Sequence, residues 1–178
     1  MKLPGHSIRA WILLLLLFSF AAYGGNIGPK IGEAMPTAIL SDFHGNSNAL
    51  SQDFKGKVVL VRFWSLDCDY CDKAMLDSLE NFYRKYKDRG FVPVAINASR
   101  IAANDERVKK LEQFSYPMLL DEYGIVAKKF GVIGLPTTFV FDGTGILRGK
   151  ITGEAGSDGF EQLFTTVLHK GVFYENNY

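Results

Sequence analysis

The chain has 178 residues, and 47% of them are hydrophobic, including 14 Phe and 8 Tyr, which is enough apolar material for one well-filled core. Lys and Arg together number 20 against 19 Asp and Glu, so no basic field is present that would attract nucleic acid or anionic lipid. We therefore expect a single folded domain that does not bind nucleic acid.

The N-terminus has the pattern of an export signal. Lys2 and Arg9 lead into an unbroken apolar run at 11–18, and the small residues Ala22 and Gly24 follow it. The run is shorter than the roughly 20 residues that a bilayer-spanning helix needs. The first 24 residues are therefore interpreted as a secretory signal peptide, with an uncleaved N-terminal anchor as the alternative. In both cases the folded part is expected outside the cytoplasm, in the periplasm or its equivalent, and only this segment is expected to contact a membrane.

The start of the mature chain predicts an irregular segment followed by a sheet. Residues 25–36 are rich in Gly and Pro and predict a lead-in without regular structure, so the domain proper is expected over 37–178. A short strand is expected at 37–40. The run VVLVRFW at 58–64 is apolar and β-branched, which is typical of a central strand buried on both faces, although Arg62 interrupts it.

The remaining elements alternate between helix and strand. Spacing of apolar residues and turn signals predict helices over 69–88, 105–114 and 122–130, strands over 91–97 and 117–121, a hairpin of 137–141 with 146–151, and a final helix from Ser157 or Asp158 to about 170. This alternation predicts an α/β fold in which strands pair in parallel within a central sheet.

The two cysteines of the chain, Cys68 and Cys71, are separated by two residues. A disulfide that closes so short a loop stabilises the fold little, so the pair is expected to do chemistry. At a junction from strand to helix, the first sulfur would lie at the helix N-terminus, where free amides and the dipole favour a thiolate. Cys68 is then the nucleophile that forms a mixed disulfide with a substrate, and Cys71 resolves it. The pair is itself the redox centre, and no separate cofactor or metal is expected.

Three other interpretations of the pair remain open. A zinc site needs four ligands, and outside the signal region His44 and His169 are the candidates to complete it. A covalent haem site needs His directly after the second cysteine, where Asp72 stands. An inert structural disulfide is the third.

Three segments together resemble the TlpA/ResA-like thioredoxins of bacterial envelopes over residues 31–170. They are GKVVLVRFW at 56–64, the CDYC motif of Cys68 and Cys71 followed by Met75, and GVIGLPTTF at 131–139. The resemblance implies a thioredoxin-like fold, with a central mixed sheet flanked by helices and an N-terminal β extension.

The resemblance also implies an activity and several residue roles. Members of this family pass electrons from a membrane thiol reductant to oxidised cysteines of envelope proteins, and some serve cytochrome c maturation. The matching positions imply that Pro136 is cis and lies against the cysteine pair, and that the Leu135 backbone pairs with an extended client peptide. Trp64 is expected to pack beside the motif, although an ordinary core aromatic residue is an equal explanation.

Three positions depart from the family pattern. Asp67 stands where the family usually has Trp, Ala74 where it commonly has Glu, and Arg62 where thioredoxin has a buried Asp. With Asp69 and Asp72, Asp67 surrounds the nucleophile with negative charge, which disfavours a thiolate and opposes the helix dipole. Because a strongly stabilised thiolate makes such a pair oxidising, as the thioredoxin and DsbA values show, we hypothesise that this protein is reducing.

Alternative functions come from other classes of protein with the same fold. A thiol peroxidase of the peroxiredoxin type would need Pro and Thr where Val61 and Ser65 stand. A copper-delivery module of the Sco type spaces its cysteines by three residues instead of two. A binding protein that keeps the fold but has lost efficient catalysis is the third alternative, which the departures at Asp67 and Ala74 keep open.

Overall fold

The computed structural model describes residues 28–102, 105–170 and 174–175; the predicted signal peptide over 1–24 lies outside these residues. The strands are β1 (Ile39–Asp42), β2 (Ser47–Ala49), β3 (Val58–Trp64), β4 (Phe91–Asn97), β5 (Met118–Leu120), β6 (Thr137–Phe141), β7 (Leu147–Thr152) and β8 (Tyr174–Glu175). The helices are α2 (Leu50–Asp53), α3 (Ala74–Tyr86), α4 (Val108–Leu111), α5 (Ile125–Lys129) and α6 (Gly156–Lys170), with a 3-10 turn at Lys87–Arg89.

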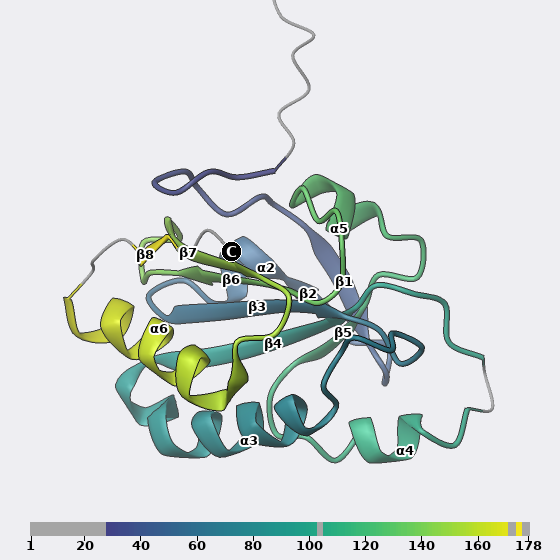
Figure 1. Cartoon of the computed structure of the whole chain (residues 1–178). Coiled ribbons are helices and arrows are strands. Elements are labelled where there is room, and N and C mark those ends of the chain that lie inside the picture. Colours follow the sequence, from purple (N-terminus) through teal and green to yellow (C-terminus); the bar gives the residue numbers. More distant parts are fainter. Residues whose placement is uncertain (1–27, 103–104, 171–173, 176–178) are drawn as a thin grey trace, which may run out of the picture.

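The strands form one mixed sheet in the order β2-β1-β5-β4-β3-β6-β7-β8 (Figure 1). At its centre β3 and β4 run parallel with α3 as the crossover, and β5 continues the parallel set. On the other side of β3, β6 and β7 form an antiparallel hairpin. The hairpin of β1 and β2 adds to the edge at β5. The predicted thioredoxin-like fold, with its N-terminal β extension, is confirmed.

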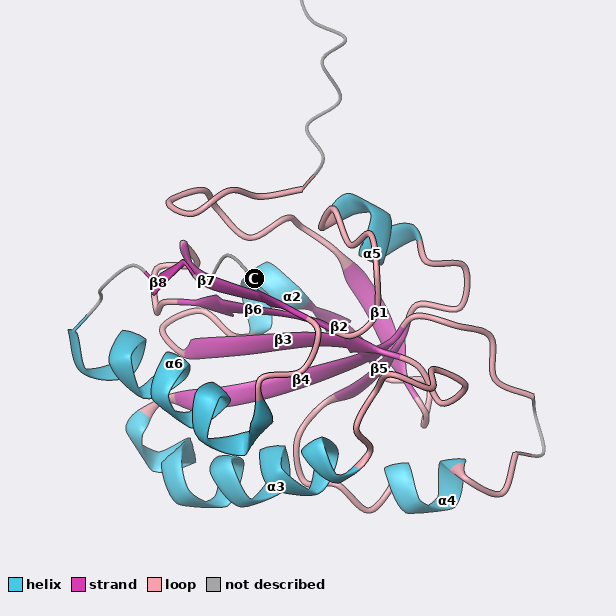
Figure 2. Cartoon of the chain, in the orientation of Figure 1, coloured by secondary structure: helices cyan, strands magenta, loops and turns pink. Residues whose placement is uncertain are grey.

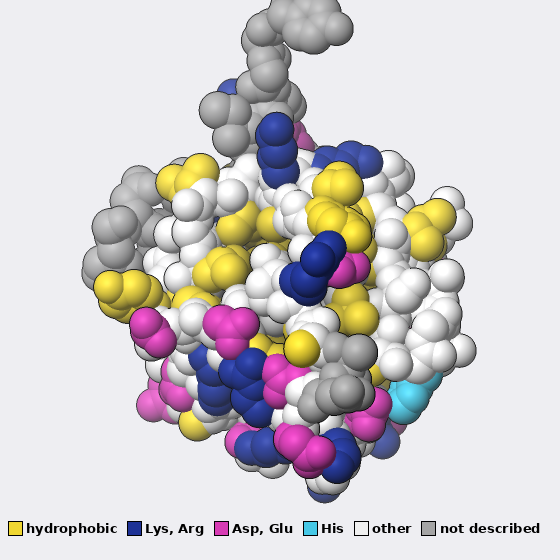
Figure 3. Space-filling model, turned by 90° about the vertical axis from the view of Figure 1, so that its right-hand side faces the viewer, with side chains coloured by type: hydrophobic (Ala, Val, Ile, Leu, Met, Phe, Trp, Pro, Cys, Tyr) yellow, Lys and Arg dark blue, Asp and Glu magenta, His cyan; other side chains and the backbone are white. Residues whose placement is uncertain are grey.

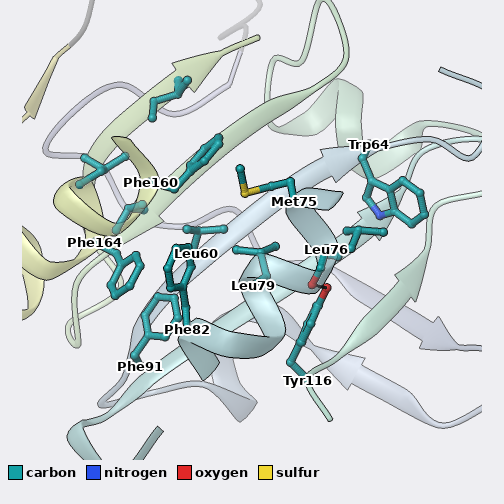
Figure 4. Packing of buried hydrophobic residues seen from close by; sticks show 14 of the residues in the cluster. Leu60, Trp64, Met75, Leu76, Leu79, Phe82, Phe91, Tyr116, Phe160 and Phe164 are labelled. Atoms are coloured by element: carbon teal, nitrogen blue, oxygen red, sulfur yellow. Dashed lines mark hydrogen bonds between the residues drawn. The ribbon is translucent and has the colours of Figure 1, made fainter. Parts of the chain in front are cut away.

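Two apolar clusters cover the two faces of the sheet, and β3 contributes to both because its side chains alternate. Figure 2 shows the helices that lie over the sheet. Leu60 and Trp64 face α3 and α6, with Leu79 of α3 and Phe164 of α6 fully buried in the same cluster (Figure 4). Val59, Val61 and Phe63 face α2 and α5, together with Phe130 and Phe139. All seven β3 residues are buried, as predicted.

Several predicted boundaries were wrong. The predicted helix over 69–88 begins only at Ala74, because the residues before it form successive turns. The helices predicted over 105–114 and 122–130 are reduced to the single-turn α4 and α5. The last helix starts at Gly156, before the expected caps Ser157 and Asp158. The strand β2, the helix α2 and the strand β8 were not predicted.

The described part of the lead-in is irregular but joined to the sheet. The Gly32 amide donates to the Leu147 carbonyl over 2.9 Å, and the Leu147 amide donates to the Glu33 carbonyl over 2.8 Å. Ala34 forms an isolated bridge with Ile146. Among the described residues, no helix is long and apolar enough to cross a membrane.

Candidate active site

The cysteine pair lies in a turn-rich loop between β3 and α3. The Cys68 amide donates to the Ser65 carbonyl and the Cys71 amide to the Cys68 carbonyl, each over 3.3 Å. Cys68 and Cys71 form a disulfide with 5.4 Å between their Cα atoms. Because α3 begins at Ala74, the expectation that the Cys68 sulfur sits at the N-terminus of this helix is wrong. Thiolate stabilisation at Cys68 must come from the loop and from nearby charges.

The two sulfurs differ in exposure. Cys71 is 5% exposed and belongs to the apolar cluster under α3, whereas Cys68 is half-buried at the surface of that cluster. An incoming disulfide can therefore reach Cys68, while Cys71 is held behind it. This asymmetry suits a nucleophile and a resolving cysteine.

Asn97 anchors the cysteine loop and was not singled out by the sequence. It is the last residue of β4, is 1% exposed, and accepts a hydrogen bond from the Leu66 amide at its Oδ1 over 3.1 Å. Its Nδ2 donates to the Ser99 carbonyl over 2.6 Å. The Ser99 hydroxyl lies 2.8 Å from that of Ser65, whose Oγ accepts from the Asp67 amide. These contacts tie the loop to the end of the neighbouring strand.

Pro136 and Leu135 lie beside the pair. The Leu135–Pro136 peptide bond is cis, as the resemblance implied, and Pro136 is buried. The Cys68 sulfur lies 3.8 Å from the Leu135 carbonyl oxygen. The cis-proline loop and the cysteine loop therefore meet at Cys68.

Trp64 ends β3 and is 1% exposed in the same apolar cluster as Cys71 and Leu66. Its indole nitrogen has no hydrogen-bond partner among the described residues. An apolar hollow of about 210 Å³ adjoins the cysteine loop, and its lining consists of Trp64, Leu66, Leu76, Leu111 and Phe114 with the cations Lys73, Arg107 and Lys110. Trp64 therefore belongs to the core and also lines this hollow.

Asp67 is exposed and held by a cation from a distant part of the chain. Arg107 donates to its Oδ1 over 2.9 Å and also binds Asp105. The hydrogen bonds from Arg107 hold the pKa of the Asp105 carboxyl below its usual value. A second cation, Lys73, donates to the Cys68 carbonyl over 2.6 Å. The negative charge around Cys68 is therefore partly balanced.

The structure places an unexpected carboxylate beside the second cysteine. Glu154, in the loop between β7 and α6, accepts a hydrogen bond from the amide of Asp72 over 2.8 Å and pairs with buried Arg62. Ala74, where the resemblance expects an acid, is exposed. No sequence pattern marks Glu154, because it comes to the motif from 82 residues away.

The two histidines that the zinc interpretation would need lie away from the cysteine pair. His169 contacts Arg89 over 2.7 Å near the end of α6, and His44 lies in the turn between β1 and β2. Among the residues that the structure describes, no three His, Cys, Asp or Glu side chains form a group that could hold a metal ion.

The surface at the C-terminal end of β3 carries both apolar and charged side chains (Figure 3). Apolar side chains gather at its centre and upper part, with a few charged side chains among them, and charges of both signs crowd its lower part. Tyr70, within the motif, is 83% exposed, and Ile133, in the cis-proline loop, is 88% exposed. Large apolar side chains exposed to this degree on two meeting loops are typical of a protein-binding surface.

Comparisons with known proteins agree with this geometry. Residues 30–164 match the Redoxin family. The chain is 32% identical to the thiol-disulfide oxidoreductase ResA of Bacillus thuringiensis subsp. konkukian, covering 89% of this chain and 94% of the relative. It is 31% identical to ResA of Bacillus cereus, covering 88% and 94%.

A solved structure supports the same assignment. It is that of a candidate thiol:disulfide interchange protein, DsbE, from Chlorobium tepidum, which has a TM-score of 0.68 and 28% identity and covers 79% of this chain and 99% of that one. The family match spans most of the chain, and the relatives share the length, the fold and a redox activity that the cysteine pair can perform. The chain therefore belongs to the Redoxin family and is a ResA-like thiol-disulfide oxidoreductase with Cys68 and Cys71 as its cysteine pair.

Proposed function

We propose that this protein is exported and reduces disulfides in envelope proteins, with apocytochrome c among its candidate clients. The observation that carries the proposal is the unequal exposure of the two cysteines, half-buried Cys68 in front of Cys71 at 5%. A structural disulfide needs no such asymmetry, whereas a reductase needs one sulfur that clients can reach and one that they cannot.

The reaction follows from this arrangement. The Cys68 thiolate of the reduced protein attacks a client disulfide, a bond forms between Cys68 and one client sulfur, and the other client sulfur leaves as a thiolate that takes up a proton. Cys71 then loses its proton and attacks the Cys68 sulfur, which releases the second client thiolate. Two electrons pass to the client, and Cys68 and Cys71 end as the disulfide seen in the structure.

The client surface is formed by the two loops that meet at Cys68. The backbone at Leu135, before cis Pro136, is available to pair with an extended peptide. Exposed Tyr70 and Ile133 flank the reactive sulfur and offer apolar contact to residues on either side of a client cysteine. Trp64 packs in the apolar cluster beneath the cysteine loop, and Asp67 lies exposed on the loop itself. A protein client fits this open surface better than a small disulfide does.

Export and electron supply rest on the sequence and on the family. The N-terminal 24 residues have the composition of a signal peptide, and a ResA-like protein outside the cytoplasm needs a source of electrons there. We infer that a membrane thiol reductant returns two electrons to the Cys68–Cys71 disulfide by the reverse exchange.

The proposal is tested by trapping clients with the full chain. Cys71→Ser cannot resolve the mixed disulfide, so it is expected to accumulate adducts that a reductant releases, and the bound partners are expected to be cysteine-containing envelope proteins. Cys68→Ser is the matched control, since it keeps one cysteine but not the exposed one. Absence of adducts, equal adducts in both variants, or exclusively cytoplasmic partners would overturn the proposal.

A further inference from the structure

Arg62 is a buried cation on the central strand. It is 1% exposed and lies on the face of β3 that packs against α3 and α6, with its guanidinium carbon 5.3 Å from the centre of the Phe160 ring. Its Nη1 donates to the Thr138 hydroxyl over 3.3 Å, while its Nε has no partner among the described residues. Burial lowers the pKa of this guanidinium, and the charge of Glu154 opposes that effect. A buried charge of this kind persists only when it is paired.

Glu154 connects this cation to the cysteine loop. One of its carboxylate oxygens, Oε1, accepts from both Arg62 and the amide of Asp72, the residue directly after Cys71. The other oxygen accepts no hydrogen bond from the residues that the structure describes, and the side chain is 27% exposed. The Arg62–Glu154 ion pair therefore lies between the core and the backbone of the redox motif.

We propose that the Arg62–Glu154 ion pair sets the reduction potential of the Cys68–Cys71 couple, with Glu154 masking the charge of Arg62. The disulfide carries no charge, whereas the reduced pair carries a thiolate, so nearby charges act on one side of the equilibrium only. A cation stabilises the reduced form and makes the couple more oxidising, as the low thiol pKa and high potential of DsbA illustrate. Glu154 cancels this effect and keeps the couple reducing.

Two titratable groups outside the ion pair interact with Arg62: Asp72 of the cysteine loop and Tyr116, which precedes β5. Tyr116 is buried and donates to the Leu76 carbonyl over 3.0 Å, and burial raises its pKa far above the neutral range. Tyr116 is therefore uncharged near neutral pH. Substitution of Glu154 or of Arg62 changes the net charge near the cysteine pair directly.

A purely structural role for the ion pair makes a different prediction. If Glu154 only satisfies a buried cation, its replacement lowers the stability of the fold and leaves the potential of the couple unchanged. If the ion pair acts on the cysteines, the potential moves in a direction set by the sign of the charge removed. The two roles are therefore separated by a measurement on the thiols.

The deciding experiment equilibrates the full chain with glutathione redox buffers. E154Q keeps the size of the side chain and removes its charge, so we expect reduction of the Cys68–Cys71 disulfide to become about tenfold more favourable, which is about 30 mV more oxidising. The pKa of the Cys68 thiol, measured from the pH dependence of its alkylation rate, is expected to fall in parallel. Glu161→Gln is the matched control, because Glu161 pairs with Lys85 at the far end of α3.

A second variant tests the sign. Arg62→Met removes the cation and leaves Glu154, so the shift is expected in the opposite direction. Where this core variant fails to fold, E154Q decides alone, since Glu154 lies in a partly exposed loop. An unchanged equilibrium in E154Q, or an equal shift in Glu161→Gln, would overturn the inference. Its failure is distinct from failure of the proposed function, because client trapping by Cys71→Ser does not depend on the potential of the closed disulfide.

Discussion

Replacement of Asn97 by Ala tests whether the end of β4 holds the cysteine loop. The substitution leaves the buried Leu66 amide without its acceptor and the Ser99 carbonyl without its donor. An orphaned buried amide costs about 1–3 kcal/mol, and the part-buried carbonyl adds less because water can reach it. We therefore expect the free energy of unfolding to fall by about 2–3 kcal/mol. For a chain of this size that corresponds to a decrease in Tm of about 4–12 °C.

The assay for this prediction is urea-induced unfolding of the oxidised protein, with thermal unfolding alongside it. Asn81→Ala, an exposed position on α3, serves as the control and is expected to change stability by less than about 0.5 kcal/mol. The reduced Asn97→Ala protein is also expected to exchange disulfides more slowly, because the loop that presents Cys68 loses its anchor. A loss of less than about 0.5 kcal/mol in Asn97→Ala would show that the loop is held by other contacts.

Two further predictions concern the body of the fold. Leu79→Ala empties a fully buried position between α3 and the sheet and is expected to cost about 2–5 kcal/mol by denaturant unfolding, against less than about 0.5 kcal/mol for the exposed Asn81→Ala. Burial alone would raise the pKa of Glu80, but hydrogen bonds from the amide and hydroxyl of Ser115, together with the hydrogen bond and charge of Arg84, outweigh it and leave the pKa below the usual 4.5. Stability from Glu80 is therefore present above pH 4.5 and is lost as the pH falls through the lowered pKa, so the acid unfolding profile of Glu80→Gln should lack this component. If Glu80→Gln and the unsubstituted protein gave the same acid unfolding profile, the prediction for Glu80 would be refuted.

The central strands could be predicted from sequence because their burial is local and continuous. The apolar runs at 58–64 and 91–97 are bounded by Lys57 and Gly90, and both strands have the predicted limits. Burial on both faces makes the residues of these two strands apolar, apart from Arg62 and Asn97, and such a run with many β-branched residues is typical of a central strand.

The start of α3 could not be predicted in the same way. The apolar spacing from Cys71 onward continues the helical pattern, yet the helix begins at Ala74, whose amide donates to the Asp72 carboxylate over 2.8 Å. The preceding residues instead follow turns that are tied to Asn97 and Glu154. These two contacts join segments far apart in the chain, so periodicity within the helix carries no information about them.

The sequence predicted the site residues that belong to a recognisable motif. It missed those that come to the site only through folding. Spacing alone identified Cys68 and Cys71, and the resemblance identified Pro136. Glu154 sits in a loop between a strand and a helix, with no motif around it, and its neighbour Arg62 looked like an interruption of a buried strand. The fold brings Glu154 to the amide of Asp72, directly after the second cysteine, and pairs it with Arg62.

The most direct test of the account is the relative reactivity of the two thiols in the reduced protein. Limiting iodoacetamide at neutral pH, followed by mass spectrometry of the peptides, measures the alkylation rate of Cys68 and of Cys71 separately. The unequal exposure of the two sulfurs predicts that Cys68 is alkylated first and that Cys71 remains protected until the protein is denatured. Equal rates, or faster alkylation of Cys71, would contradict the assignment of Cys68 as the nucleophile.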